Sequence, residues 1–389
     1  MKLPEHLARI VEAQVPRFSD GEMARRRVAV EALLDEHGCD HLVFCGLNRF
    51  GSAVQWLTQW PVTAEAVGVL SPGERDALFV QYVNHAPQAR LIADMADVAW
   101  GGESSISAAI EVLKRRGSHG DRIAYIGPLT AEQHARLSAH YPNIANLTRA
   151  YIRLRQVKSN EEIDWLRIGA YFSDLGMAAL RDGLKIGMSE RELGDLVERA
   201  YISQGATNVI HYIGTTSMSA ADLGVPRQFP TTRRVQQSDV VVAEISAAFW
   251  EHPGQVLRSL ALGGPTKLYR DLHAAADSAF DAIAAVLQAG ATPADVIEAS
   301  GVIEDAGFTI IDDLLHGYGG GYLPPILGCK SRPAGPVPQE PFRDGQTVVI
   351  QPNVVTRDGK AGVQTGEMVV ITKSGIERLH TIPRGFHTI

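Results

Sequence analysis

Residues 238–259, with the sequence SDVVVAEISAAFWEHPGQVLRS, contain the side chains best suited to chemistry. Apolar runs on both sides of the turn residues WEHPG predict two buried strands joined by a short turn. Glu244, His252, Gln255 and Arg258 stand out there among apolar or small residues. Burial of Glu244 would raise its pKa toward neutrality, which suits a general acid or base. We therefore predict that this hairpin lines an active site, with a structural carboxylate paired to Arg258 or to a histidine as the alternative for Glu244.

Three histidines are further candidates for proton transfer, because imidazole titrates near neutral pH. His316 opens the sequence HGYGGGYLPP, whose four glycines allow the backbone to approach a ligand closely. No GK[ST] or G-x-G-x-x-G context surrounds it, so we do not expect a phosphate-binding loop. His252 lies in the hairpin turn and His211 in the strand-like run VIHYIG, and each is also readily explained as a structural histidine.

The elements of the first 150 residues alternate between helices and strands. Residues 21–37, 105–116 and 131–140 have helical patterns, and the runs HLVFCG (41–46), AVGVL (66–70), ALFV (77–80) and RIAYIG (122–127) read as strands. Such alternation is typical of an α/β domain. We predict a domain over residues 1–153 and a second domain over residues 154–389.

The second domain contains an internal repeat. Ser159 and Glu162 have capping-box spacing and open a predicted helix to about residue 181, followed by a helix at 190–204 and strands at 207–213, 239–248 and 256–263. Helices at 267–288 and 294–306 and strands at 347–355 and 363–372 then repeat this order. Two similar halves predict a site between them.

The second domain resembles the creatinase, prolidase and aminopeptidase P superfamily. The resemblance rests on RQVKSNEEIDWLR, GLKIGMSERELGDLVERA, SDVVVAEI with LRSLALGGPT, LLHGYGGGY, FRDGQTVVIQPNVV and GVQTGEMVVITKSGIERL, and it covers essentially all of residues 150–389. It implies the pita-bread fold, with two pseudo-symmetric ααββ halves after a smaller N-terminal α/β domain. It also implies a homodimer.

The peptidases of this superfamily bind two metal ions through two aspartates, a histidine and two glutamates. Matched to those motifs, the five ligand positions are occupied here by Glu244, Gln255, Gly320, Gln351 and Gly366. Glutamine is neutral and glycine has no ligating side chain, whereas a two-metal site needs several anionic ligands. Glu367 adjoins the last position, but a slip of one residue would move its side chain to the opposite face of the sheet. We therefore expect neither a metal nor another cofactor.

Creatinase is a member without metals, and the C-terminal sequence IPRGFHTI resembles its ending, where His387 matches a histidine after a proline-glycine turn. The resemblance does not extend to the residues that bind creatine, so we do not expect creatine as the substrate. Leu257 stands where creatinase has a glutamate for the guanidinium group, and no arginine for the carboxylate follows WLTQW (56–60).

The resemblance also implies a pocket crowded with amides at the former metal positions. Gln255, Gln351, Asn353 and Gln364 would favour a neutral, polar substrate, because an amide both donates and accepts hydrogen bonds. Arg258 is most readily explained as a structural residue, with pairing to a substrate carboxylate as the alternative. Tyr212 and Tyr318 offer hydroxyl donors, although aromatic residues at such positions usually serve packing.

The leading hypothesis from the sequence is a metal-independent, creatinase-like hydrolase that cleaves a C–N bond of a small polar molecule, with His316 and Glu244 as acid–base groups. A lyase or decarboxylase and a non-catalytic binding homologue are the alternatives, and an Xaa-Pro metallopeptidase ranks last.

Composition limits the partners and the location. The net charge of -7 argues against nucleic acid or an anionic membrane as a partner. No run approaches the roughly 20 apolar residues of a membrane span, and MKLPEHLARI does not resemble a signal peptide. Three cysteines without metal-type spacing are typical of reduced thiols. We expect a cytoplasmic enzyme with a small-molecule substrate.

Overall fold

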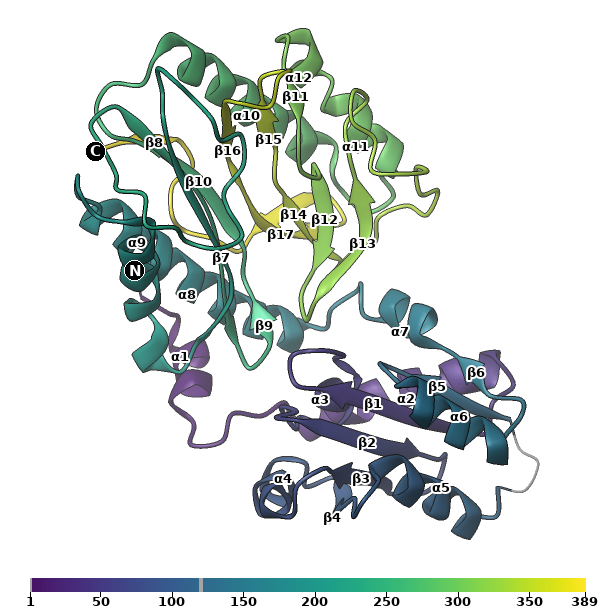
Figure 1. Ribbon diagram of the computed structural model, residues 1–389. Helices are drawn as coiled ribbons and strands as arrows, with labels where there is room; N and C mark the ends of the chain where they lie inside the picture. Colours follow the sequence, from purple (N-terminus) through teal and green to yellow (C-terminus); the bar gives the residue numbers. More distant parts are fainter. Residues whose placement is uncertain (1, 119–121) are drawn as a thin grey trace. The chain divides into compact units, whose positions relative to one another are not determined.

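The computed structural model describes residues 2–118 and 122–389 and divides into two compact units (Figure 1). One unit comprises Glu12–Arg155, and the other comprises Met1–Val11 together with Gln156–Ile389. Both units mix helices and strands, which confirms the predicted α/β class with a smaller N-terminal domain before a larger C-terminal one. Within the described residues, no helix combines the length and the apolar composition that a membrane crossing requires.

The unit Glu12–Arg155 is built on a six-stranded sheet in the order β4-β3-β2-β1-β5-β6. Alternation along β1 explains its two covered faces: Leu42 and Phe44 pack with α2, whereas Val43 and Cys45 pack with α5. The strands are β1 (His41–Leu47), β2 (Glu65–Leu70), β3 (Asp76–Val80), β4 (Ala96–Trp100), β5 (Ile123–Ile126) and β6 (Ala145–Asn146). The helices are α2 (Asp20–Glu36), α3 (Ala53–Thr58), α4 (Ala86–Ile92), α5 (Ser105–Arg115), α6 (Ala131–His140) and α7 (Thr148–Leu154), with a 3₁₀ turn at Val83–His85.

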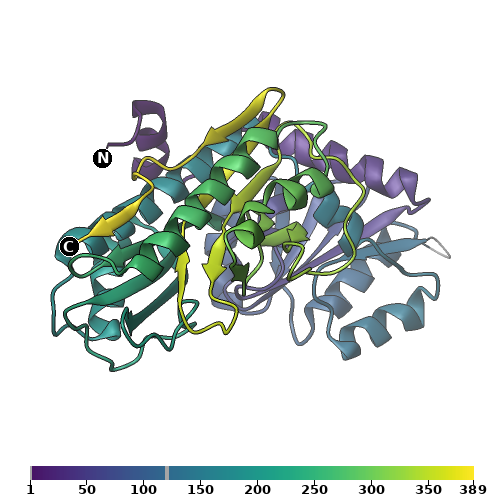
Figure 2. The same cartoon turned by 90° about the horizontal axis from the view of Figure 1, so that it is seen from above.

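The larger unit contains the predicted repeat. Its first half has α8 (Asn160–Gly183), α9 (Glu190–Arg199), a 3₁₀ turn at Ile202–Gln204, β7 (Thr207–Ser217), β8 (Asp239–Phe249), β9 (His252–Pro253) and β10 (Val256–Ala261), and α1 (Glu5–Glu12) precedes it in the chain. The capping box of Ser159 and Glu162 at the start of α8 is confirmed. The second half begins with α10 (Lys267–Val286), α11 (Pro293–Ala299) and α12 (Val302–Asp305). Figure 2 shows α10, the long green helix, against the yellow strands of this half.

The strands of both halves form one curved path, β13-β12-β14-β17-β10-β8-β7, and a separate three-stranded sheet, β11-β15-β16. The prediction of a single strand at 347–355 was wrong. Instead, β14 (Thr347–Ile350) ends in the first sheet, and β15 (Asn353–Val355) begins in the second. Pro352 separates them, because it lacks the N–H that would continue the hydrogen-bond ladder. The strand predicted at 363–372 divides likewise into β16 (Gly362–Gln364) and β17 (Gly366–Thr372). The remaining strands are β11 (Thr309–Ile310), β12 (Leu315–Tyr318), β13 (Tyr322–Leu327), β18 (Gly375–Arg378) and β19 (Phe386–Thr388).

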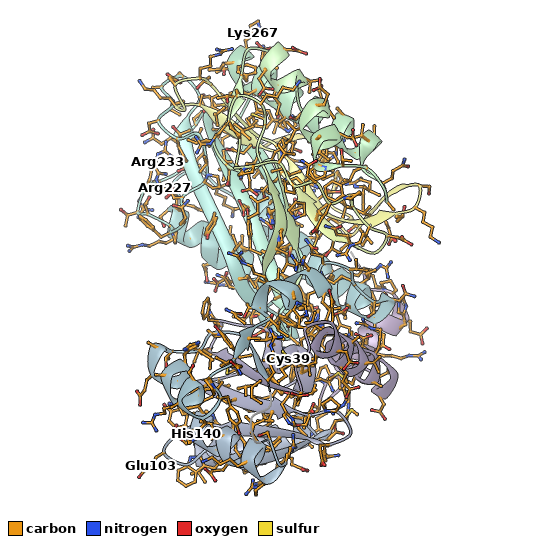
Figure 3. All side chains as sticks on the ribbon, turned by 90° about the vertical axis from the view of Figure 1, so that its right-hand side faces the viewer. Cys39, Glu103, His140, Arg227, Arg233 and Lys267 are labelled. Atoms are coloured by element: carbon orange, nitrogen blue, oxygen red, sulfur yellow. The ribbon has the colours of Figure 1, made fainter. Side chains whose placement is uncertain are left out.

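The long connection between β7 and β8 is anchored on the carboxylate of Glu190, at the start of α9. This carboxylate accepts hydrogen bonds from the backbone N–H of Thr215 at 2.9 Å, from the N–H of Thr231 at 3.0 Å and from Arg227 Nη1 at 2.9 Å. Burial would raise the pKa of Glu190, but hydrogen bonds from the hydroxyl and backbone N–H groups of Thr231 and Thr215 lower it overall. Arg227 and Arg233, both in this connection, lie at the same side of the unit in Figure 3, and Arg233 Nη1 bonds Thr215 Oγ1.

Two glycines allow α8 to lie directly against the β8–β9 hairpin. A Cβ atom added to Gly169 would lie 2.2 Å from the carbonyl oxygen of His252, and one added to Gly254 would lie 2.3 Å from the Cα of Ala170. Ser173 Oγ also donates to the carbonyl oxygen of Gly254 at 2.8 Å. The hairpin that carries Gln255 is therefore fixed by backbone contact with α8.

Gly169→Ala should destabilise the protein, because neither backbone can move away without breaking this packing. We expect a loss of about 1–3 kcal/mol or more in the free energy of unfolding, measured by urea titration. Gly194→Ala on α9 is the matched control: its Cβ would meet nothing within 4 Å, and alanine favours a helix over glycine by roughly 0.5–1 kcal/mol. Equal stability of the two variants would contradict the close approach.

Candidate active site

Five buried side chains from the two halves of the larger unit form one hydrogen-bonded group, which we call the central cluster: Glu244, Gln255, Gln351, Gln364 and His316. Glu244 Oε1 accepts from Gln255 Nε2 at 2.6 Å, and Glu244 Oε2 accepts from Gln364 Nε2 at 3.4 Å. Gln351 Oε1 lies 3.4 Å from Gln255 Nε2 and 3.2 Å from His316 Nε2. The cluster therefore joins the two halves, where the internal repeat predicted a site.

Glu244 is the ionisable centre of this group and is only 5% exposed. Burial raises its pKa to about 8, and the nearby charge of Asp312 adds to the rise, while hydrogen bonds from Gln364 and Gln255 oppose it. Among the described residues, no lysine or arginine forms an ion pair with Glu244. At neutral pH the side chain is therefore mostly protonated, but it ionises within the working range of an enzyme.

His316 is held in its neutral form. Burial lowers its pKa to about 4. Nδ1 lies 3.0 Å from the carbonyl oxygen of Gly317, and Nε2 faces the amide oxygen of Gln351. Because a neutral imidazole has one N–H, it donates to one of these oxygens and keeps its other nitrogen as an acceptor.

Three residues that the sequence analysis did not single out border the cluster: Asp312, Asp313 and Tyr322, which we call the acidic rim. The Tyr322 hydroxyl donates to Asp313 Oδ2 at 2.6 Å, and its ring stacks on His316 with centroids 4.1 Å apart. Burial and a hydrogen bond with Asp313 raise the pKa of Asp312 to about 6. Tyr322 is 50% exposed, so the rim connects the cluster to solvent. The signal in the sequence was the acidic pair four and three residues before His316.

Two predicted catalytic histidines lie on the opposite face of the sheet from Glu244. His211 pairs with Ile245, whereas Tyr212 pairs with Glu244, and side chains alternate between faces along a strand. His211 Nε2 bonds the hydroxyl of Tyr201 at 2.8 Å. His387 pairs with Leu260 in β19 and bonds the carbonyl oxygen of Pro383 at 3.2 Å. Leu260 also faces away from Glu244, because Leu257 is the cross-strand partner of Glu244. Neither histidine reaches the cluster, which corrects their proposed catalytic role.

Tyr318 meets the ring of His316 edge-on, whereas His252 lies against α8, and both have structural contacts. His252 Nδ1 bonds the carbonyl oxygen of Trp250 at 2.9 Å, and its ring meets Trp165 edge-on. The Tyr318 hydroxyl lies 2.8 Å from Ser246 Oγ, and burial raises its pKa. Tyr212 is the direct cross-strand partner of Glu244, and its role as a hydroxyl donor stays a prediction.

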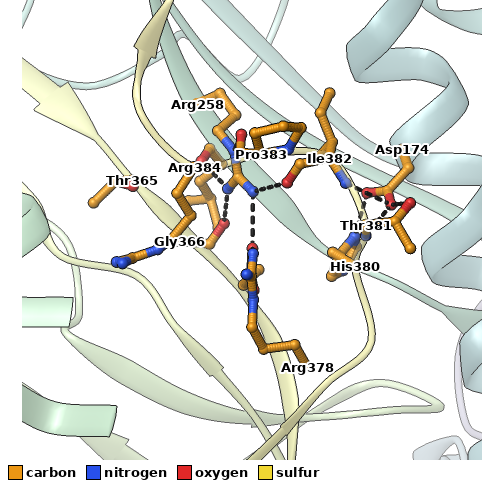
Figure 4. A network of polar contacts seen from close by, with 12 residues as sticks. Asp174, Arg258, Thr365, Gly366, Arg378, His380, Thr381, Ile382, Pro383 and Arg384 are labelled. Carbon is orange, nitrogen blue, oxygen red and sulfur yellow. Dashed lines mark hydrogen bonds and ion pairs between the residues drawn. The ribbon is translucent and has the colours of Figure 1, made fainter. Parts of the chain in front are cut away.

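Arg258 and Asn353, which were predicted to bind substrate, are bonded inside the protein. Arg258 is 0% exposed and donates to the carbonyl oxygens of Leu257, Gly366, Ile382 and Pro383 and to Glu367 Oε2 at 2.8 Å (Figure 4). Asn353 Nδ2 donates to the carbonyl oxygens of Gly224 and Val363, each at 3.2 Å. All donor groups of Arg258 are thus used by the fold, so none remains for a substrate carboxylate.

The residues of the cluster do not fit the two-metal centre described above. Glu244 is its only carboxylate, and within the described residues no group of three or more His, Cys, Asp or Glu side chains could hold a metal ion. A Cβ at Gly366 would lie 2.4 Å from the carbonyl oxygen of Ile350, and Gly320 has a φ of 76°, which disfavours histidine there. Glu367 faces the other side of the sheet, as the register predicted, and forms ion pairs with Arg258 and Arg378.

The repeated ααββ halves with a polar cluster between them define a pita-bread domain. The model of metallopeptidase family M24 matches residues 164–373, more than half of the chain, and the chain belongs to this family. A Pyrococcus furiosus Xaa-Pro dipeptidase is 22% identical over 231 residues, which cover 58% of this chain and 63% of that protein. An uncharacterized peptidase of Staphylococcus epidermidis is 23% identical over 230 residues. The match spans less than two thirds of the length of these relatives.

Solved structures agree over nearly the whole chain. An X-Pro aminopeptidase from Thermotoga maritima superposes with a TM-score of 0.81 at 17% identity, covering 93% of this chain and 99% of that one. An Xaa-Pro dipeptidase from Bacillus anthracis also gives 0.81 at 17% identity, covering 94% and 100%. At such identities the likeness establishes the fold.

These comparisons contradict the leading hypothesis of a metal-independent, creatinase-like hydrolase of non-peptide C–N bonds. The matched family is one of metallopeptidases, and the relatives named above are Xaa-Pro or uncharacterized peptidases. The lyase and binding alternatives are set aside with it, and the Xaa-Pro hypothesis, ranked last, is the one that the comparisons favour. The creatinase hypothesis relied on the missing metal ligands and on the C-terminal motif, whose His387 lies away from the cluster. The domain boundary between residues 153 and 154 and the homodimer stay predictions.

Proposed function

We propose that the central cluster hydrolyses a peptide bond in a small peptide, with Xaa-Pro dipeptides as the substrate class. The observation that carries the proposal is Glu244, a buried carboxyl group with a pKa of about 8 between the two halves of an M24 domain. The substrate class follows from the names of the relatives, which include Xaa-Pro dipeptidases.

The chemistry assigned to the chain's own residues is proton transfer. Ionised Glu244 accepts a proton from water as the water oxygen attacks the peptide carbonyl carbon. The same carboxyl group then gives that proton to the leaving nitrogen as the C–N bond breaks, which leaves a carboxylic acid and an amine. Gln255 and Gln364 orient the carboxylate, since both bond it. Neutral His316 and the amide of Gln351 are the other groups of the cluster that can bond the substrate.

The direct test is the release of proline from Gly-Pro and Ala-Pro by the purified full chain, compared with the Glu244→Gln variant. Parallel samples are washed with a chelator or supplied with Mn²⁺, Co²⁺ or Zn²⁺, and the bound metal is counted by elemental analysis. Turnover of the dipeptides that depends on Glu244 supports the proposal. The absence of proline release under every condition would refute it. Two tightly bound metal equivalents per chain would contradict the conclusion that the residues do not fit a two-metal centre.

The pH dependence of kcat/KM should follow the ionisation of Glu244. Since the ionised form is the base, activity should rise with pH and level off above about pH 8. His316, with a pKa of about 4, stays neutral throughout this range, so its ionisation does not add a second change of slope to the pH profile. The profile is measured from initial rates between pH 5 and pH 10. A rate that falls through pH 8 would mean that the protonated carboxyl group is the active form.

A further inference from the structure

We propose that residues 382–389, which we call the C-terminal strap, are docked on the larger unit at neutral pH and are released in mild acid, when His273 and His387 become protonated. This conformational switch lies outside the central cluster. It goes beyond the proposed function and does not depend on it, because release of the strap is measured without a substrate.

The first part of the strap docks on one face of α10. His273, Asp277, Phe280 and Asp281 lie three or four residues apart along this helix, so their side chains share that face. Arg384 of the strap lies over Phe280, with its guanidinium carbon 4.0 Å from the ring centroid. The same guanidinium group forms ion pairs with Asp281 at 2.5 Å and with Asp277 at 3.4 Å. Charge and an aromatic contact therefore hold this end of the strap.

The second part of the strap is β19, which pairs in parallel with β10. The N–H of Ile389 donates to the carbonyl oxygen of Ala261, and the N–H of Gly263 donates to the carbonyl oxygen of Ile389, each at 2.9 Å. Between the two parts, Gly385 has a φ of 134°, and a Cβ there would meet nothing within 4 Å. The backbone can therefore pivot at this glycine, and the amide protons of Ile389 and Gly263 report whether β19 is docked.

His273 connects docking to protonation. Its ring stacks on that of Phe386 in β19, with the centroids 5.0 Å apart and the planes at 10°. His273 is 6% exposed, and its Nε2 has no hydrogen-bond partner among the described residues. Asp277 Oδ2 lies 3.9 Å from Nδ1, beyond hydrogen-bonding distance, and the other oxygen of Asp277 faces Arg384. A proton on this buried ring would therefore be poorly compensated.

The charges around His273 agree with this geometry. Burial lowers the pKa of His273, and the carboxylate of Asp277 opposes this shift. Positive charge comes from Arg384 of the strap and from Arg258 of β10, and His387 adds a second titrating ring. While the strap is docked, His273 is therefore neutral at neutral pH.

His387, which belongs to the strap itself, shows the same direction. Burial lowers its pKa, while the carbonyl oxygen of Pro383, 3.2 Å from Nε2, opposes the shift. Arg258 of β10 and Arg181 of α8 lower the pKa further, and Asp182 of α8 raises it. Docking of the strap thus favours the neutral form of both histidines.

The sign of the pH dependence follows from these shifts. A histidine whose pKa is lower in the docked state contributes fully to docking above its ordinary pKa of about 6.5. This contribution declines as the pH falls below that value, toward the lower pKa of the docked state. At pH 5.5, each such histidine reduces the docking equilibrium by up to about tenfold. Two histidines together therefore make the strap sensitive to mild acid.

The strap is attached to a strand that contacts the central cluster. Arg258 of β10 donates to the carbonyl oxygens of Ile382 and Pro383, at 2.9 Å and 3.0 Å (Figure 4). The next residue, Ser259, donates from Oγ to the carbonyl oxygen of Gln364 and accepts from its backbone N–H, each at 2.9 Å. Release of the strap therefore frees β10 directly beside a residue of the central cluster.

Hydrogen exchange of the full chain, followed by mass spectrometry between pH 7.5 and pH 4 and corrected for the intrinsic exchange rate at each pH, tests the proposal. We expect the protection of residues 383–389 to fall about tenfold to a hundredfold between pH 7.5 and pH 5.5, while residues 240–245 of β8 keep theirs. Unchanged protection of the strap, or an equal fall in β8, would overturn the proposal. A fall confined to about pH 4, where carboxyl groups titrate, would assign release to aspartates and overturn it as well.

His273→Phe assigns the effect to the stacked ring, because phenylalanine can stack on Phe386 but cannot be protonated. We expect the fall in protection to be about tenfold smaller than in the wild type. His140→Phe, at the exposed end of α6, is the control and should keep the wild-type fall. An equal fall in His273→Phe and the wild type would overturn the proposal. If His273→Phe does not fold, His387→Gln takes its place, and an unchanged fall in that variant would have the same meaning.

Discussion

Glu244→Gln should lower kcat for dipeptide hydrolysis by about 10²–10⁴-fold, the range of general acid–base catalysis. The substitution keeps the size of the side chain and an oxygen that can accept from Gln255, but it removes the proton-transfer group. The loss should therefore appear in kcat at every pH and not mainly in KM. Steady-state kinetics between pH 6 and pH 9 provide the measurement, with Asp305→Asn as the control. A variant that keeps more than a tenth of the wild-type kcat would exclude Glu244 as the base.

The same substitution should stabilise the fold at high pH. Folding raises the pKa of Glu244 from the ordinary value of a glutamate to about 8, so the unfolded chain ionises first as the pH rises. The protonated carboxyl group of Glu244 therefore contributes fully to stability below the pKa of the unfolded state, and this contribution is lost as the pH rises through 8. Glutamine does not ionise, so the variant has no such loss. We expect Glu244→Gln to be at least about 2 kcal/mol more stable than the wild type at pH 9 and nearly equal to it at pH 4, measured by urea titration. A difference that does not vary with pH would contradict the raised pKa.

The sequence predicted correctly the parts of the site that lie on a single hairpin or that follow from aligning a strand with the motifs of the family. Glu244 and Gln255 were expected to line the same pocket because they match two ligand positions of the family on one hairpin, and they are bonded at 2.6 Å. The opposite orientation of Glu367 followed from the period of two along a strand. Both inferences are local.

The inferences that failed depended on long-range pairing. His211 was chosen by its place in the sequence, but the register of β7 against β8 turns it away from Glu244. His387 lies in a strand that pairs in parallel with β10, which no local pattern indicates. Asp312 and Asp313 were overlooked because the glycines after His316 suggested a loop, whereas residues 315–318 and 322–327 form paired strands that bring the rim to the cluster.

Arg258→Met should destabilise the protein by about 3–5 kcal/mol, because it removes the buried partner of Glu367 and leaves that carboxylate with Arg378 alone. Arg258 and Glu367 are both 0% exposed, and their 2.8 Å ion pair joins β10 to β17. The arginine also donates to the carbonyl oxygens of Ile382 and Pro383, which ties down the C-terminal segment. Urea titration measures the loss. Lys267→Met is the control, because its ion pair with Asp271 is largely exposed and is expected to contribute less than about 1 kcal/mol.

A second substitution separates the charge from the packing around it. Arg258→Met leaves the buried carboxylate of Glu367 with Arg378 as its remaining ion-pair partner. Arg258→Met/Glu367→Met also removes this carboxylate, so the double variant should recover part of the stability that the single variant loses. Recovery would show that the under-compensated charge of Glu367 causes most of the damage, whereas no recovery would assign the loss to the carbonyl oxygens that Arg258 caps. A loss in Arg258→Met no larger than that in Lys267→Met would contradict a structural role. Arg258 would then again be a candidate for the substrate contact that its burial now argues against.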